Sequence, residues 1–372
     1  MSILIGADIV PSSSNDVAFS SGNMSSIIGE ELTNELKQAD YRIFNLECPL
    51  VDVASPIKKC GPALRACVST AKGLKTMGVD LLTLANNHIM DQGMSGLEST
   101  FLTLRKEGIS FVGAGHNANE ASIPFLFEHK RKKIGVYACA EHEFSIAGMN
   151  KPGANPFDPL ESFDHIHSLR KICDYIIVLY HGGKEHYRYP SPMLQRVCRK
   201  FVEKGSDLVI CQHSHCIGCE EKYLNGTIVY GQGNFIFNSC NVNTAQTSLL
   251  VKIDDEMNVS YLPLEMYENG VRLANHEKSK QILSDFYERS LKIKDEDFLN
   301  DEYKKFAEKM IGRYLLTGRL FYKVLNRLSG NRFSKIFANI YSKQQLLALR
   351  NFIECEAHRE LWINGIVGKT ER

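Results

Sequence analysis

Short apolar runs alternate with stretches of helical periodicity up to about residue 211. Apolar runs bounded by polar or turn-forming residues predict strands, whereas apolar residues recurring every three or four positions predict helices. The expected strands cover residues 3–10, 43–47, 81–85, 109–112, 134–139, 175–180 and 208–211. The expected helices cover residues 27–36, 69–77, 97–104, 161–172 and 191–203, with loops at 12–26 and 52–66. Strands that alternate with helices predict a mostly parallel sheet with helices packed on it.

The pattern changes after residue 211. Four apolar segments follow one another without intervening helices, at residues 227–230, 235–237, 248–253 and 259–264. Successive strands without crossover helices are typical of antiparallel pairing. We therefore predict antiparallel strands in this part and a mixed α/β domain over residues 1–268.

Residues 275–372 form a second predicted region, which is helical by pattern. Its apolar stripe consists of Phe306, Met310, Tyr314, Phe321, Val324 and Leu328. Residues 309–350 carry nine Lys or Arg and no Asp or Glu. Such a basic helix can cap a site and steer an anionic substrate, make peripheral contact with an anionic membrane, or simply be a solvated surface. Cys355 and His358 could reach a site from here, although an ordinary helical role is the simpler interpretation.

Composition narrows the class of protein. The chain has 372 residues, which at ~150 residues per domain suggests two domains. Lys and Arg number 44 against 43 Asp and Glu, so net charge gives no sign of a nucleic-acid-binding protein. No apolar run reaches the ~18 residues of a transmembrane helix, and residues 1–8 lack the basic start of a signal peptide. The eleven scattered cysteines predict thiols in a reducing compartment, so we expect a cytoplasmic protein.

The candidate chemistry lies where the predicted strands end. The residues found there are Asp8, Glu47, Asn86-Asn87-His88, His181 and His213-Ser214-His215. Ligands bind at the carboxyl ends of strands in open α/β sheets. Each residue alone has an ordinary interpretation as a turn residue, a helix cap or a core histidine. Together, carboxylates, an amide oxygen and imidazoles could bind two divalent ions, with Glu47 as a bridging ligand.

A set of motifs in a fixed order covers residues 6–237. They are Gly6-Ala7-Asp8, Asn45-Leu46-Glu47, Leu84-Ala85-Asn86-Asn87-His88, Gly113-Ala114-Gly115, His181-Gly182-Gly183-Lys184-Glu185, residues 205–210, His213-Ser214-His215 and residues 230–235. This ordered set resembles the CapA-type capsule-synthesis proteins, a branch of the calcineurin-like metallophosphatases. The resemblance implies a four-layer α/β/β/α sandwich with mixed sheets, followed here by a C-terminal helical appendage.

The resemblance also implies roles for the site residues. Asp8 and His215 would hold one ion, Asn87, His181 and His213 would hold the other, and Glu47 would bridge them. The ions would be Mn, Fe or Zn. His88 would assist at a phosphoryl or leaving-group oxygen, with Asp91 supporting its proton. The wider phosphatase family has His where this chain has Val10 and Asp where it has Glu47, so the first ion lacks one imidazole ligand.

Several other residues are candidates for contact with a substrate. Lys184, Glu185, His186 and Arg188 follow a candidate ligand in a glycine-containing loop, although the same residues would suit an ordinary solvated loop. Asn234 could line the site or hold His215 in place. Cys216 and Cys219 lack the second cysteine pair of a structural zinc site, so they are taken as loop thiols, with a redox or extra-ligand role left open.

These residues predict a metal-dependent hydrolase. The expected reaction is hydrolysis of a phosphomonoester or phosphodiester by a metal-activated water. The resemblance implies a small, anionic, phosphorylated precursor in capsule or exopolysaccharide biosynthesis as substrate. Two alternatives remain open: hydrolysis or transfer of a poly-γ-glutamate-type amide at the same site, and a non-catalytic scaffold of a biosynthetic complex. The sequence assigns no oligomeric state.

Overall fold

Two mixed β-sheets form the centre of the computed structural model, which describes residues 2–59, 61–237, 245–315 and 342–370. The first sheet has the spatial order β16 (Gly270–Leu273), β15 (Val259–Tyr267), β14 (Thr247–Asp254), β1 (Ser2–Ile9), β2 (Tyr41–Leu46), β3 (Leu81–Thr83) and β4 (Ser110–Val112). A further strand, β13 (Asn234–Ile236), also pairs with β1. Strands β1 to β4 run parallel to one another.

The second sheet has the spatial order β11 (Glu220–Tyr223), β12 (Gly226–Val229), β10 (Leu208–Gln212), β9 (Tyr175–His181), β7 (Lys132–Ala140) and β6 (Phe125–His129). Its four central strands are parallel, and β11 and β6 pair antiparallel at its edges. A separate short pair is formed by β5 (Ala114–Gly115) and β8 (Gly153–Ala154). A short helix, α5 (Ala118–Ala121), follows β5.

The central strands of the second sheet are apolar on both faces, as expected for strands covered on both sides. In β9, Ile177 and Leu179 belong to the core shared with the first sheet. Ile176 and Val178 point the other way, into a core shared with α6 (Ser162–Arg170) and α7 (Pro192–Glu203). This alternation follows from the two-residue period of a strand, and it places one sheet between the other sheet and a helical layer.

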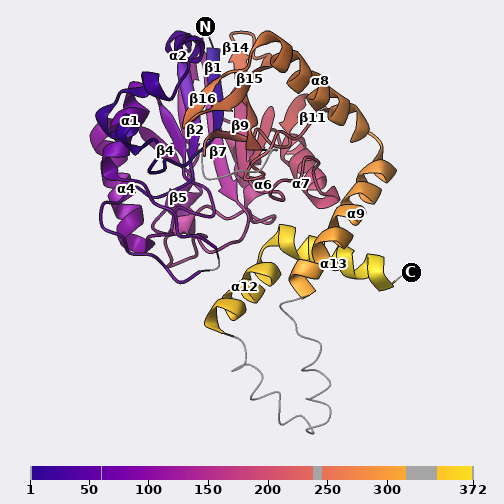
Figure 1. Cartoon of the computed structure of the whole chain (residues 1–372). Coiled ribbons are helices and arrows are strands. Elements are labelled where there is room, and N and C mark those ends of the chain that lie inside the picture. Colours follow the sequence, from indigo (N-terminus) through magenta and orange to yellow (C-terminus); the bar gives the residue numbers. More distant parts are fainter. Residues whose placement is uncertain (1, 60, 238–244, 316–341, 371–372) are drawn as a thin grey trace.

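The helices that precede β4 lie on the opposite side of the molecule. They are α1 (Asp16–Ser21), α2 (Glu30–Gln38), α3 (Ala71–Thr76) and α4 (Gly93–Glu107), with 3₁₀ turns at Met24–Ser26 and Val68–Thr70. Figure 1 shows α1 and α4 on one side of the strands and α6 and α7 on the other. The predicted four-layer α/β/β/α sandwich is therefore confirmed.

The prediction of antiparallel strands after residue 211 is wrong for two of the four segments. Strand β12 is parallel to β10, and β13 is parallel to β1. The reason for the first error is β11, a polar edge strand of sequence Glu-Glu-Lys-Tyr that turns the chain back before β12. An edge strand needs no apolar face, so the hydrophobic pattern did not reveal it. The antiparallel prediction holds for β14 and β15.

The segment at residues 12–26 was expected to be a loop, but it contains α1 and a 3₁₀ turn. Ala18 and Phe19 of α1 are buried against the core, and they anchor this short helix. Tertiary packing thus makes a helix of a segment too short and too polar to show clear periodicity.

The C-terminal region is helical, as predicted. Its described helices are α8 (His276–Lys292), α9 (Glu296–Leu315), α12 (Lys343–Glu354) and α13 (Glu356–Thr370). Figure 1 shows α12 and α13 together below the sandwich, beside the end of α9. Tyr303 and Ala307 of α9 pack with Leu361 of α13 and with Tyr187 of the main body. The division into domains at residues 268 and 275 remains a prediction.

Part of the predicted apolar stripe can be placed. Phe306 and Met310 pack on the cluster formed by α9, α13 and Tyr187. Phe321, Val324 and Leu328, and most of the basic segment 309–350, lie outside the described residues, as does the side chain of Tyr314. Within the described ranges, no helix combines the length and apolar character needed to cross a bilayer.

Candidate metal centre

Parallel strands bring the candidate ligands to one edge of the sandwich. In register, Asp8 of β1 lies beside Asn45 of β2 and Asn234 of β13. Glu47 follows the end of β2, His181 is the last residue of β9 and His213 follows the last residue of β10. Because parallel strands end at a common edge, residues far apart in sequence meet there.

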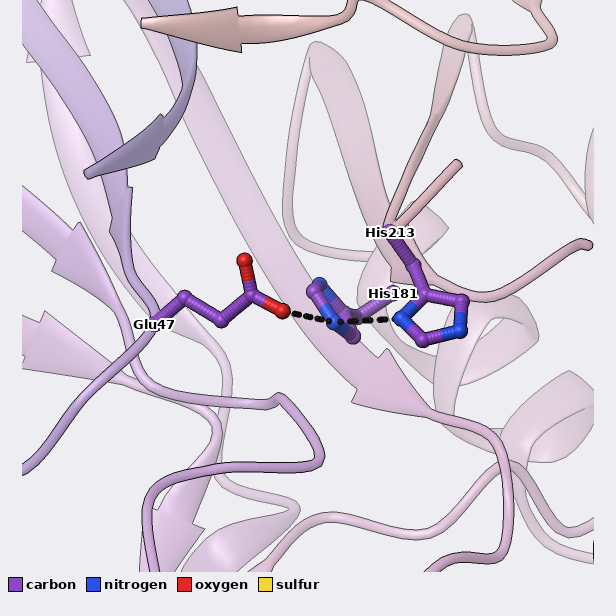
Figure 2. A group of neighbouring side chains, drawn as sticks. All are labelled: Glu47, His181 and His213. Carbon is purple, nitrogen blue, oxygen red and sulfur yellow. Dashed lines mark hydrogen bonds and ion pairs between the residues drawn. The ribbon is translucent and has the colours of Figure 1, made fainter. Parts of the chain in front are cut away.

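The first group of ligand atoms surrounds Nε2 of His181. This atom lies 3.2 Å from Oε1 of Glu47, 3.2 Å from Nδ1 of His213 and 3.1 Å from Oδ1 of Asn87. Figure 2 shows Glu47 and His213 on either side of the His181 ring. Ligand atoms ~2.0–2.2 Å from a tetrahedral ion are separated by ~3.3–3.6 Å. The other three atoms therefore each lie about one ligand-to-ligand distance from Nε2 of His181, and the ligand atoms of Glu47, His181 and His213 all lie within 4.8 Å of one another.

The second group consists of Asp8, Glu47 and His215, whose ligand atoms all lie within 4.8 Å of one another. Nδ1 of His215 lies 2.8 Å from Oδ1 of Asn234 and 3.5 Å from Oδ2 of Asp8. Because both of these oxygens are acceptors, Nδ1 of His215 carries a hydrogen. Asn234 thus orients His215.

Glu47 belongs to both groups. Its side chain is fully buried, and apart from the contact of Oε1 with Nε2 of His181, neither carboxylate oxygen has a hydrogen-bonding partner among the described residues. Burying a carboxylate without a hydrogen-bonding partner costs free energy, and buried carboxylates in proteins are usually paired with a cation or bound to a metal ion. The unsatisfied oxygens and the surrounding nitrogen and oxygen donors therefore fit a pair of divalent ions that share Glu47.

The loop after β10 holds two ligands in a strained backbone. His213 has φ 84° and His215 has φ 52°, in the left-handed region that non-glycine residues seldom adopt. Such strain persists where the surrounding structure enforces it, and it concentrates at functional sites. The loop is held by the amide of His186, which donates to the carbonyl of Ser214 at 2.7 Å.

Electrostatics distinguish the two histidines of this loop. Burial and the neighbouring imidazoles of His181 and His215 lower the pKa of His213 well below its usual value, so His213 is neutral, the form that binds metals. Burial opposes the charged form of His215, but its hydrogen bond to Asp8 and the charge of Glu47 raise its pKa to about 10. Burial likewise opposes ionisation of Asp8, but His215, His181 and the hydrogen bond from Asn45 together lower the pKa of Asp8. The carboxylates of Asp8 and Glu47 thus favour positive charge at this centre.

His88 lies beside this centre on a network of its own. Its Nδ1 lies 2.5 Å from Oδ2 of Asp91. The ammonium group of Lys59 lies 2.6 Å from Oδ1 of Asp91 and 3.2 Å from Nδ1 of His88. The backbone amide of His88 donates to Oδ1 of Asn86 at 3.1 Å. The ring is therefore held at Nδ1, which leaves Nε2 available for another partner.

Comparison with known proteins supports one family. Residues 3–239 match the model of the bacterial capsule synthesis protein PGA_cap. The chain belongs to the PGA_cap family. It is 29% identical over 186 residues to the PGA biosynthesis protein CapA of Bacillus subtilis, a match that covers 49% of this chain and 48% of that protein. The chain thus spans about half the length of that relative.

Two further proteins align with a larger part of this chain. The PGA_cap chain is 26% identical over 294 residues to the capsule biosynthesis protein CapA of Bacillus anthracis, covering 74% of this chain and 72% of that protein. A solved structure of a novel phosphatase from Mycoplasma pneumoniae aligns with a TM-score of 0.40 and 14% identity, covering 73% of this chain and 90% of that one.

The loop after His181 lies close to this centre. An added Cβ on Gly182 would lie 2.9 Å from Cγ of Glu141, so glycine permits the close approach of backbone and carboxylate. The distance from Nζ of Lys184 to Nδ1 of His358 is 3.2 Å. Arg188 donates to the carbonyl of Ile217 at 3.0 Å.

The two remaining candidate residues of this loop are Glu185 and His186. The side chain of Glu185 is exposed, whereas His186 is half-buried. The centroid of the His186 ring lies 5.9 Å from the centroid of the His215 ring. The roles in substrate binding that the sequence predicts for Lys184, Glu185, His186, Arg188 and Asn234 remain predictions. The same holds for the catalytic roles of His88 and Asp91.

Sequence reasoning assigned no role to four residues near this PGA_cap centre, although Asn45 lies in one of its motifs. Asn45 donates to Oδ1 of Asp8 at 2.8 Å and accepts from Asn86 at 3.0 Å. Glu143 accepts from Nδ2 of Asn87 at 3.3 Å, which leaves Oδ1 of Asn87 facing His181. Glu141 and Glu143 follow β7 just as the other candidates follow their strands, so this signal was present in the sequence. Lys59 lies in an irregular loop and gave no such signal.

The cysteines agree with the expectation of free thiols. No disulfide joins the nine cysteines within the described ranges, and eight of these thiols are buried. Cys216 and Cys219 are both fully buried. Burial raises the pKa of the Cys219 thiol well above its usual value, as expected for an unreactive thiol in an apolar core.

Proposed function

We propose that this chain is a metal-dependent hydrolase that cleaves a phosphate ester in capsule or exopolysaccharide biosynthesis. The observation that carries the proposal is the pair of ligand groups that share Glu47, whose two buried carboxylate oxygens lack hydrogen-bonding partners. Sites with two ions suit phosphoryl transfer, because the ions clamp the group on both sides. The family supports the biosynthetic setting.

The proposed ligands divide as the family resemblance implies. Asp8 and His215 would hold one ion, Asn87, His181 and His213 would hold the other, and Glu47 would contribute to both. Divalent ions bound there supply Lewis-acid stabilisation of the phosphoryl group and activate water for attack. The nitrogen and oxygen donors suit Mn, Fe and Zn alike.

The remaining groups of the site act on the substrate. Nδ1 of His88 is held by Asp91, so its Nε2 can donate a hydrogen bond or a proton to a phosphoryl or leaving-group oxygen. Lys59 adds a positive charge next to this pair. In this proposal, Lys184 attracts a small anionic substrate from the rim, and Asn234 acts by orienting His215.

A second candidate is hydrolysis or transfer of an amide bond in a poly-γ-glutamate-type polymer. The name of the Bacillus subtilis relative, a PGA biosynthesis protein, favours this candidate. The same site can serve both reactions, because each needs an activated water or nucleophile and stabilisation of a developing oxyanion. A non-catalytic scaffold is the third possibility, and the same experiment distinguishes it.

The test combines metal analysis and turnover on the same sample. The gently purified full chain is analysed by mass spectrometry for bound metal, then assayed with p-nitrophenyl phosphate and bis-p-nitrophenyl phosphate under added Mn²⁺. We expect two ions per chain at this centre and turnover of at least one ester. His213→Ala is expected to abolish metal binding at this centre and turnover together, whereas the surface variant His116→Ala leaves both unchanged.

Two results contradict the proposal. Undiminished turnover by His213→Ala shows that the reaction does not use these ligands. A protein that holds both ions but hydrolyses neither ester points to the amide candidate, which is then assayed on γ-glutamyl oligomers. If those are also inert, the scaffold role replaces both enzymatic candidates.

A further inference from the structure

A third group of metal-ligating side chains lies between the C-terminal helices and the main body. Its members are Glu143, in the loop after β7, Cys355, between α12 and α13, and His358, in the first turn of α13. One ligand atom from each lies within 4.8 Å of the others. Cys355 is fully buried, and His358 is only 9% exposed. Residues separated by more than 200 positions thus converge on one point.

We propose that Glu143, Cys355 and His358 bind a third divalent ion of the zinc class. A thiolate, an imidazole and a carboxylate form a mixed ligand set that favours zinc over harder ions such as magnesium or calcium. Nε2 of His358 lies 3.8 Å from Oε1 of Glu143, close to the ~3.3–3.8 Å that separates ligands of tetrahedral zinc.

Glu141 lies close enough to serve as a fourth ligand. Oε2 of Glu141 lies 3.8 Å from Sγ of Cys355, and Oε1 of Glu141 accepts from the amide of Gly183 at 3.1 Å. With Glu141 the ion has four protein ligands, as in structural zinc sites. The proposed role is therefore to hold α12 and α13 against the main body.

This third site differs in chemistry from the centre around Glu47. The candidate ligands of that centre are nitrogen and oxygen atoms, whereas the third site contains sulfur. The two are connected, because Glu143 also accepts a hydrogen bond from Nδ2 of Asn87. An ion bound by Glu143 would position Asn87 and so link the C-terminal helices to the first centre.

Lys184 provides the rival arrangement. Its Nζ lies 3.2 Å from Nδ1 of His358, so the side chains of Lys184, His358 and Glu143 form a polar chain without any ion. Binding of a metal by Nε2 of His358 puts the ring hydrogen on Nδ1, and the ammonium group must then turn away. The two arrangements are mutually exclusive, so a metal-binding experiment separates them.

The experiment uses the full chain loaded with Co²⁺ and, in parallel, with Zn²⁺. A cobalt ion bound by Cys355 produces a near-ultraviolet thiolate-to-cobalt charge-transfer band, which nitrogen and oxygen ligands cannot produce. We expect this band in the wild-type protein and its loss in Cys355→Ser, with one fewer zinc ion per chain. Cys198→Ser, which changes another fully buried thiol, keeps both the band and the ion.

Two further variants make the outcome decisive. His358→Gln removes the imidazole but keeps the sulfur, so the band should weaken or shift even if Cys355→Ser fails to fold. His213→Ala should keep the band while losing the ions held around Glu47, which separates this inference from the proposed function. A folded wild-type protein without the band, or a band that persists in Cys355→Ser, overturns the third site and leaves the Lys184–His358–Glu143 chain in its place.

Discussion

The ammonium group of Lys59 lies 2.6 Å from Oδ1 of Asp91, and both side chains are buried. The other carboxylate oxygen of Asp91 lies 2.5 Å from Nδ1 of His88 and accepts from the amide of Leu64 at 2.6 Å. Asp91 therefore joins the irregular loop that contains Lys59 to the candidate general acid. Because this pair is buried, its loss should affect both stability and chemistry.

Lys59→Met should strongly destabilise the protein. Removing one partner of a buried ion pair leaves the other charge uncompensated, which costs about 3–5 kcal/mol. Urea denaturation of the metal-loaded protein measures the change in the free energy of unfolding. The control is Lys58→Met, which changes the exposed neighbour and should stay within about 0.5 kcal/mol of the wild type. Equal stability of the two variants would contradict the structural role of Lys59.

His88→Asn should lower kcat while metal binding remains. Loss of a general acid typically costs a factor of about 10²–10⁴, and His88 is not a ligand in either group around Glu47. Steady-state kinetics and metal analysis on the same preparation measure both quantities. His167→Asn, at an exposed position, serves as control. If His88→Asn loses its metals, His88 supports the metal centre itself, and its proposed role at the substrate is wrong.

Glu141 should make the protein less stable as the pH rises. Burial and the charge of Glu356 raise its pKa from 4.5 to about 8. Between these values the folded protein binds a proton that the unfolded chain has lost, so the free energy of unfolding falls with increasing pH. Above about pH 8 both states are ionised, and the loss is complete.

Glu141→Gln removes this titration. Urea unfolding at pH 6 and pH 8, in the presence of a chelator, should show a smaller fall in stability for Glu141→Gln than for the wild type. Glu128→Gln, at an exposed position, should behave as the wild type does. An unchanged pH dependence in Glu141→Gln would show that the buried carboxyl is not the titrating group.

Glu360 should hold α13 onto the main body. Its carboxylate accepts from Oγ of Ser191 at 2.6 Å and from the amide of Met193 at 3.1 Å, at the start of α7. Glu360→Ala removes these hydrogen bonds, each of which contributes about 0.5–1.5 kcal/mol. We expect faster amide hydrogen exchange in α13 and at residues 191–194. Glu354→Ala, which removes an exposed pair with Arg350, is the matched control and should leave this exchange unchanged.

The hydrophobic pattern predicted buried strands correctly but did not reveal an edge strand. The strongly apolar strands β1, β9 and β10 lie where the sequence predicts them, because strands buried on both faces carry continuous apolar runs. The polar edge strand β11 was missed, and the direction of β12 was wrong as a result. An edge strand is defined by its partner rather than by its own burial, so its sequence carries little signal.

The sequence by itself determined a mixed α/β domain and the residues at its strand ends, because local periodicity encodes buried strands and polar residues interrupt it where the strands stop. The four-layer arrangement of the sheets and helices was implied only by the family resemblance. The tertiary structure alone decided which of these residues meet. It showed that Glu47 lies between two groups of ligands, that Lys59 reaches Asp91 from an irregular loop, and that α13 brings His358 to Glu143. Contacts between distant segments depend on how the sheets and helices pack, and no local pattern records that packing.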